Sequence, residues 1–166
     1  MILVTIGMND APYGRMFQMI DDLAPSLGEE VVMQTGNIDY AAANCKTVKF
    51  LVDSEMKDLF DSADLIIAHA GIGTILNGLQ RNIPLVLVPR SVVMDADCDQ
   101  QDIVAKKVES MGRGVRVTSL EELPQKINDA KSLSFPPYVK NTDLCDGLSK
   151  ILDEFNNVLD KHQNNM

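Results

Sequence analysis

Hydrophobic positions follow two patterns that alternate along the chain. Short unbroken apolar runs are typical of strands buried on both faces of a parallel sheet. Between them, apolar residues recur every three or four positions, as on one face of a helix. The apolar runs predict strands or extended segments at Ile2–Ile6, Glu30–Gln34, Thr47–Val52, Leu65–Ala68, Leu85–Val88 and Val115–Val117.

The helical pattern occupies the segments between these strands. The first predicted helix carries Met16 to Leu27 and ends at Gly28, a favourable residue just past a helix C-terminus. Asp53 or Ser54 is expected to cap the next helix, and Ser119 with Glu122 reads as a capping box. The remaining helices carry Met56–Phe60, Ile72–Leu79, Ile103–Met111, Leu120–Ala130 and, near the end of the chain, Leu144–Val158.

Strands alternating with helices at this spacing predict an α/β fold, a Rossmann-like open parallel sheet with helices on both faces. We expect a single domain over residues 1–160 and a frayed tail at 161–166. Such sheets bind ligands at the carboxyl ends of their strands. The turns predicted to share that edge are Gly7–Asp10, Gly36–Asp39, His69–Thr74 and Arg90–Gln101.

Composition narrows the functional classes. The 166-residue chain has a net charge of −9, which disfavours nucleic acid and direct attraction to anionic lipid. Its three cysteines form no C-x-x-C pair, as expected in a reducing cytoplasm. The apolar runs are too short to cross a bilayer, and the first residues lack the basic region of a signal peptide. We therefore expect a cytoplasmic protein without direct membrane insertion.

The stretch from Ala68 to Leu79 reads as strand, glycine turn and helix. Gly71 and Gly73 let backbone N–H groups approach a ligand, and the start of the following helix suits an anion such as a phosphate. Two glycines that merely form a tight turn are an equally open interpretation. The first turn, beginning at Gly7, is not G-x-G-x-x-G, which disfavours a nicotinamide dinucleotide.

Other motifs carry less weight. Asp95, Asp97 and Asp99 imitate a metal-binding loop, but a calcium loop requires glycine and glutamate where this chain has Gln100 and Lys106. A solvated acidic loop is favoured, and no metal site is predicted. A Ser–His–Asp device would need His69, yet no G-x-S-x-G turn is present. His69 is expected either beside a phosphate or hydrogen-bonded to its own loop.

One ordered set of motifs resembles a known family. The set comprises Val4-Thr5-Ile6-Gly7, Gln34-Thr35-Gly36-Asn37, Asp64-Leu65-Ile66-Ile67, Ala68-His69-Ala70-Gly71-Ile72-Gly73-Thr74, Pro84-Leu85-Val86-Leu87-Val88-Pro89 and Asp99-Gln100-Gln101. From Met1 to about Val117 it is similar to the C-terminal, nucleotide-sugar-binding domain of family 28 glycosyltransferases. The resemblance is to the stand-alone small subunits, such as the catalytic subunit of the dolichol-linked N-acetylglucosamine transferase and bacterial exopolysaccharide glycosyltransferase subunits. It implies half of a GT-B fold.

The resemblance also implies a binding site for a UDP-sugar. By this likeness His69, Ala70, Gly71, Gly73 and Thr74 cradle the diphosphate. In the same cleft, the resemblance implies roles for Gly7, Met8 and Asn9 beside the diphosphate, Gly36 nearby, Phe50 and Leu51 at the uracil, Asn77 at the ribose, and Gln100 and Gln101 at the sugar hydroxyls. No catalytic residue is assigned. No cofactor is expected, because the UDP-sugar is itself the donor substrate.

The implied activity is a metal-independent hexosyl transfer, with inversion, from UDP-N-acetylglucosamine or a related UDP-hexose to a lipid-linked acceptor. A membrane-anchored, acceptor-binding partner subunit, or a homo-oligomer, is expected to complete the site, placing the chain peripherally at the inner face of the membrane. Three positions depart from the family: Asn77 replaces glutamate, Gln100 replaces histidine and Met8 replaces threonine. A non-catalytic nucleotide-sugar-binding or scaffolding subunit with a degenerate site therefore stays open, as does a nucleotide-sugar epimerase fragment.

Overall fold

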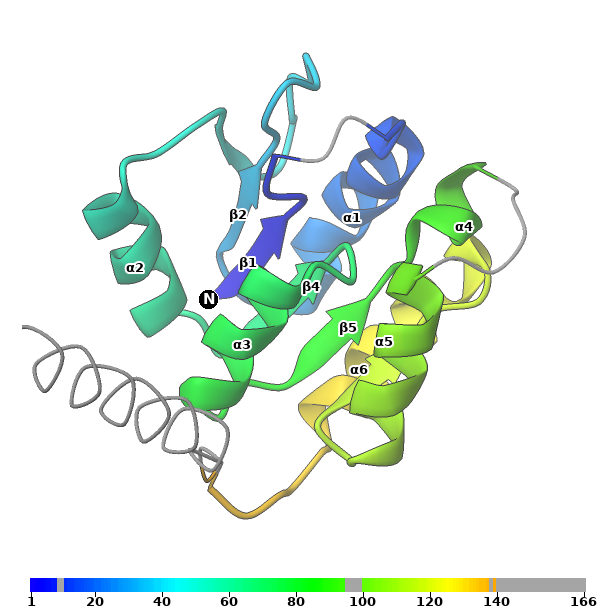
Figure 1. Cartoon of the computed structure of the whole chain (residues 1–166). Helices are drawn as coiled ribbons and strands as arrows, with labels where there is room; N and C mark the ends of the chain where they lie inside the picture. Colours follow the sequence, from blue (N-terminus) through cyan, green and yellow to red (C-terminus); the bar gives the residue numbers. More distant parts are fainter. Residues whose placement is uncertain (9–10, 95–99, 138, 140–166) are drawn as a thin grey trace, which may run out of the picture.

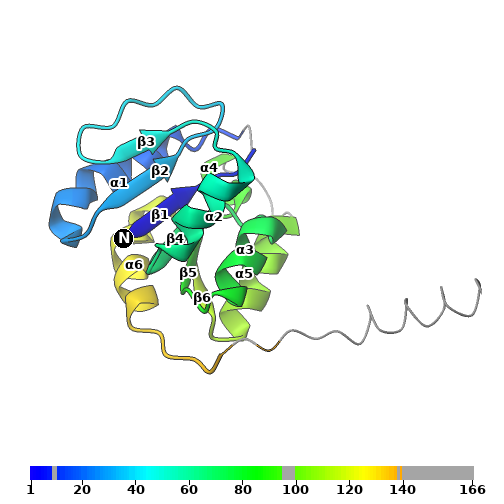
Figure 2. The same cartoon turned by 90° about the vertical axis from the view of Figure 1, so that its left-hand side faces the viewer.

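The fold is built on a parallel sheet. The computed structural model describes residues 1–8, 11–94, 100–137 and 139. Within these residues six strands pair in the order β3-β2-β1-β4-β5-β6, and every pair is parallel. Figure 1 labels β1, β2, β4 and β5, and Figure 2 labels all six strands. Their bounds are β1 Ile2–Thr5, β2 Val31–Gln34, β3 Lys46–Val48, β4 Leu65–Ala68, β5 Leu85–Leu87 and β6 Gly114–Arg116. The predicted Rossmann-like open sheet is confirmed.

The central strands are apolar because helices cover both of their faces. Successive side chains of a strand point to opposite sides. Ile2 and Val4 of β1 therefore join one core, while Leu3 joins the other. Strand β1 pairs with β2 on one side and β4 on the other, so its backbone has no free edge. All residues of β1, β2, β4 and β5 are consequently buried.

The helices divide between the two faces as the apolar periodicity predicts. Figure 2 shows α1 and α6 on one side of the sheet and α3 and α5 on the other. Phe17 of α1 and Ile127 of α6 belong to the first core, whereas Phe60 of α2, Ile75 of α3 and Val108 of α5 belong to the second. The bounds are α1 Gly14–Leu27, α2 Asp53–Asp61, α3 Ile72–Gln80, α4 Arg90–Met94, α5 Gln100–Ser110 and α6 Leu123–Lys131, the last preceded by a 3₁₀ turn at Leu120–Glu122. None of these described helices is long and apolar enough to cross a membrane.

The segment expected to be a turn at Arg90–Gln101 instead contains helix. Residues Arg90–Met94 form α4, and α5 begins at Gln100. Val92 and Val93 pack against the first core, and their burial stabilises this short helix in an otherwise polar stretch. The acidic motif at 95–99 and the predicted helix at 144–158 lie outside the described residues, as does the 161–166 tail.

Of the two predicted cap residues, the one before α2 is wrong, and Ser119 is confirmed as a cap without the predicted side-chain hydrogen bond. Helix α2 is preceded by Val52, whose N–H donates to the Glu55 carboxylate at 3.2 Å, so Asp53 and Ser54 lie inside the helix. Ser119 is the N-cap of the 3₁₀ turn before α6, as predicted, but its side chain makes no capping hydrogen bond. The Glu122 carboxylate accepts the N–H of Thr118 at 3.1 Å. The carboxylates reach back to a free N–H as in a capping box, but one residue earlier than the sequence pattern indicates.

A buried carboxylate that the sequence did not reveal anchors the segment before β3. Asp21 of α1 accepts the N–H groups of Ala43 and Asn44, each at 2.8 Å, and the Tyr40 hydroxyl at 3.2 Å. Burial acts to raise the Asp21 pKa, but the hydrogen bonds that the carboxylate accepts together lower the pKa by more than burial raises it. The carboxylate therefore stays ionised. This contact ties α1 to the loop that leads into edge strand β3.

A substitution at Gly114 tests how closely β5 and β6 pack. A Cβ at this position would lie 2.6 Å from the Leu85 carbonyl oxygen and 2.9 Å from its Cβ, so Gly114→Ala must push β6 away from β5. We expect it to lower the free energy of unfolding by about 1–3 kcal/mol in urea denaturation. Gly14→Ala is the matched control, because nothing lies within 4 Å of a Cβ there. Equal stability of the two variants would contradict this packing.

Candidate functional site

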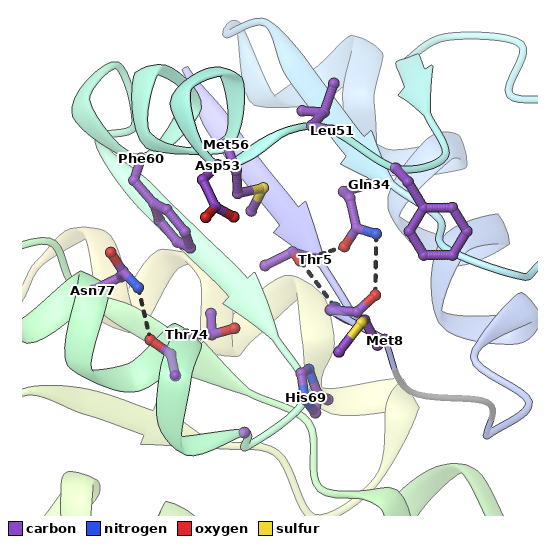
Figure 3. A pocket seen from close by; sticks show the side chains of 14 residues that line it. Thr5, Met8, Gln34, Leu51, Asp53, Met56, Phe60, His69, Thr74 and Asn77 are labelled. Carbon is purple, nitrogen blue, oxygen red and sulfur yellow. Dashed lines mark hydrogen bonds between the residues drawn. The ribbon is translucent and has the colours of Figure 1, made fainter.

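A pocket of about 580 Å³ opens at the carboxyl edge of the sheet (Figure 3). It lies where β1, β2 and β4 end, and α2 and α3 form its sides. Fourteen residues line it: Thr5, Gly7, Met8, Gln34, Phe50, Leu51, Asp53, Met56, Phe60, His69, Gly71, Gly73, Thr74 and Asn77. The pocket therefore lies at the edge where the sequence predicts a ligand.

The first turn of α3 offers backbone donors to this pocket. The N–H of Gly71 donates to the His69 carbonyl at 2.7 Å, and that of Ile75 to the Gly71 carbonyl at 3.1 Å. The N–H groups of residues 72–74 have no hydrogen-bond partner among the described residues. Consecutive free N–H groups at a helix start attract an anion, which the positive end of the helix dipole stabilises further.

His69 sits against the two glycine turns. A Cβ on Gly71 would lie 2.2 Å from its Nε2 atom, and a Cβ on Gly7, which has φ of 59°, would lie 3.2 Å from its Cε1 atom. These glycines are therefore required where the imidazole packs. Burial lowers the His69 pKa, and hydrogen bonding to the Thr5 backbone raises the pKa by a smaller amount. The ring is thus neutral near pH 7, and its buried Nδ1 has no hydrogen-bond partner among the described residues.

A buried polar network forms the floor of the pocket. The Thr5 hydroxyl donates to the Gln34 side-chain oxygen at 2.6 Å and accepts the Gly7 N–H at 3.1 Å. The Gln34 amide nitrogen donates to the Gly7 carbonyl at 3.1 Å and to the Lys49 carbonyl at 2.8 Å. Thr5 and Gln34 are 0% and 4% exposed. The network joins the turn after β1 to the segment that carries Phe50 and Leu51.

The side of the pocket away from the glycine turn is mainly apolar. Phe50, Leu51, Met56 and Phe60 line it, and Phe50 is exposed over half its surface. The peptide groups of Leu51 have no hydrogen-bond partner within the described part of the chain. A flat aromatic or heterocyclic ring could stack here while its polar edge meets that peptide.

Nine of the residues predicted for the site line this pocket: Gly7, Met8, Phe50, Leu51, His69, Gly71, Gly73, Thr74 and Asn77. Gly36 and Ala70 are buried and do not line the pocket, and a Cβ on Gly36 would lie 3.1 Å from the Gly7 carbonyl oxygen. Gln100 and Gln101 start α5 and do not line the pocket; the Gln101 side-chain oxygen accepts the Arg90 N–H at 2.9 Å. Asn9 lies outside the described residues.

The sequence reasoning missed five lining residues: Thr5, Gln34, Asp53, Met56 and Phe60. Thr5 and Gln34 each end an otherwise apolar strand, and that position at the carboxyl edge was the signal that could have identified them. Asp53, Met56 and Phe60 lie on α2, where helical spacing alone does not show which residues face a ligand.

A family model describes most of the chain. Residues 1–143 match the glycosyltransferase family 28 C-terminal domain. The chain belongs to this family. A similar protein from Aquifex aeolicus (strain VF5) is named UDP-N-acetylglucosamine--N-acetylmuramyl-(pentapeptide) pyrophosphoryl-undecaprenol N-acetylglucosamine transferase; it is 30% identical over 76% of this chain and 38% of its own length. NDP-glycosyltransferase YjiC from Bacillus subtilis (strain 168) is 22% identical over 80% of this chain and 35% of its own length.

Solved structures agree on the fold of this family 28 domain. The glycotransferase of kitacinnamycin superposes with a TM-score of 0.63 at 19% identity, covering 79% of this chain and 34% of that one. Os79 from O. sativa, solved in complex with UDP, gives 0.62 at 16% identity, covering 79% and 31%. The expected half of a GT-B fold is confirmed. The chain spans little more than a third of the curated relatives it matches.

The lowered pKa of His69 makes the stability of this family 28 domain depend on pH. The unfolded chain takes up the histidine proton at a higher pH than the folded chain does. The free energy of unfolding should therefore fall as the pH drops from about 7.5 to about 5.5, and His69→Gln should fall less steeply. Urea denaturation across this range measures both slopes. Parallel slopes would show that His69 is not held in its neutral form.

Proposed function

We propose that the chain is the donor-binding half of a glycosyltransferase. It binds a UDP-sugar, UDP-N-acetylglucosamine or a related UDP-hexose, and a partner subunit supplies the lipid-linked acceptor. The observation that carries this proposal is the row of N–H groups at the start of α3, which have no hydrogen-bond partner in the described part of the chain and lie at a pocket with an apolar opposite side. One end suits a diphosphate and the other a base.

The chemistry assigned to this chain is stabilisation of the leaving group. When the bond between the sugar and the diphosphate breaks, negative charge accumulates on the diphosphate oxygens. N–H groups that are already aimed at those oxygens stabilise the charge without rearranging. No lysine or arginine lines the pocket in the described part of the chain, so the backbone donors and His69 are the groups assigned to the diphosphate. Inversion follows from direct attack by the acceptor on the opposite face of the sugar.

Support for a partner comes from the rim of the pocket. Met8, Phe50, Val52 and Ile72 are 85%, 54%, 63% and 55% exposed, and all follow strands at the carboxyl edge. Large apolar side chains gathered at one edge are typical of an interaction surface. We propose that a membrane-anchored subunit covers this rim and forms the second wall of the cleft.

Nucleotide binding is the first test. In calorimetric titration we expect UDP to bind in the micromolar to millimolar range and uridine at least about tenfold more weakly, because uridine lacks the diphosphate. Gly71→Ala should weaken UDP binding at least about tenfold, since the added methyl group displaces His69. Gly14→Ala, at a position that does not line the pocket and has open space for a Cβ, should bind like the unmodified chain. Absence of UDP binding would refute the proposal.

Transfer is the second test. Purified chain is mixed with membranes of the organism that encodes it and with radiolabelled UDP-N-acetylglucosamine or UDP-glucose. We expect label to enter the lipid extract only when chain and membranes are both present, because neither half closes the cleft alone. Heat-treated membranes are the control. UDP-sugar binding without any transfer would instead favour a scaffolding subunit.

A further inference from the structure

The part of the pocket that lies between the two ends of the ligand is bounded by α2 and α3. If the diphosphate occupies the start of α3 and the base lies along Phe50 and Leu51, the ribose is left between Asp53 on one helix and Asn77 on the other. A ribose presents two adjacent hydroxyl groups. Carboxylate oxygens are the strongest side-chain acceptors for a pair of hydroxyls, because these hydrogen bonds are charge-assisted.

Asn77 is already engaged within the protein. Its side-chain nitrogen donates to the Gly73 carbonyl at 2.9 Å, and its side-chain oxygen accepts from Arg81 at 2.8 Å. Arg81 is itself held, since it donates to Asp61 at 2.6 Å and lies over the Phe60 ring. The Asn77 amide is therefore fixed and neutral, and its nitrogen and its oxygen each already make one hydrogen bond within the protein.

Asp53 has the opposite properties. It is the one carboxylate among the described residues that line the pocket, and Figure 3 shows it on the α2 side beside Met56 and Phe60. Its carboxylate has no hydrogen bond or ion pair within the described part of the chain. Because Glu55 holds the free N–H before α2, Asp53 is not needed as a cap.

Asp53 is exposed to the pocket's solvent, so its carboxylate is free to accept from an entering ligand. Beside an anionic ligand it favours the hydroxyl donors of the ligand over the diphosphate, which it repels. The Leu51 peptide is free to meet the polar edge of the base. We propose that Asp53, rather than Asn77, accepts the ribose hydroxyls and makes the site selective for ribonucleotides. This inference rests on the proposed function and names the residue that sets its nucleotide preference.

The test compares UDP with 2′-deoxy-UDP, which differ only in the 2′-hydroxyl. The unmodified chain should bind UDP about tenfold more tightly, the range of one hydrogen bond to a charged group. Asp53→Asn should bring the two dissociation constants within about twofold. The ratio is the decisive readout, because removing a negative charge strengthens binding of both nucleotides alike and a loss of stability weakens both alike.

Two further variants separate Asp53 from its neighbours. Asp58→Asn removes the same charge from an exposed position on α2 that does not line the pocket, and it should keep the tenfold ratio. Asn77→Ala should also keep the ratio to within about twofold. Asp53→Ser gives a second measurement if the asparagine variant folds poorly.

The outcomes distinguish the two proposals. If UDP binds and Asp53→Asn keeps the preference for UDP, or Asn77→Ala abolishes it, the role of Asp53 is refuted while nucleotide binding stands. A chain that binds both nucleotides equally before any substitution also refutes it. If UDP does not bind at all, both proposals fail.

Discussion

The hydrogen bond between Thr5 and Gln34 holds the candidate site together. Two polar side chains are buried at the ends of strands that are otherwise entirely apolar. Burying such groups is tolerated only when their hydrogen bonds are made, and here both are satisfied by each other and by nearby backbone. The pair consequently fixes the relative positions of the turn after β1 and of the segment after β3. The apolar sheet supplies rigidity, and this pair turns it into a shaped pocket.

The strands and the two-sided covering by helices could be predicted because burial on both faces leaves a strong apolar signal. Helix α4 could not, since only Val92 and Val93 bury apolar surface in a segment dominated by polar residues. The cap of α2 lies one residue before the expected position because Glu55 reaches the Val52 N–H, and Glu122 bonds to Thr118, which the pattern does not specify. The role of Asp21 could not be predicted because two of its hydrogen-bond donors are backbone N–H groups more than twenty residues away, at Ala43 and Asn44.

The candidate site also has one part that local sequence predicts and one part that it does not. The glycine turn and the start of α3 follow from local sequence, since strand, glycine and helix adjoin one another. The α2 side depends on how that helix is rotated about its axis, which tertiary packing decides. Asp53 therefore read as a cap although it lines the pocket. Gln101 bonds to the Arg90 backbone across the α4 segment, a contact that no sequence spacing indicates.

The exposed apolar rim has a consequence for the life of the chain outside a complex. Met8, Phe50, Val52 and Ile72 form an exposed apolar surface at the carboxyl edge. Chaperones and quality-control proteases recognise surfaces of this kind. The net charge of −9 makes separate copies repel one another, which slows their aggregation. If the proposed partner subunit covers this rim, copies that lack the partner would stay dispersed until they bind it or are degraded. Their amount would then be set by degradation as well as by synthesis.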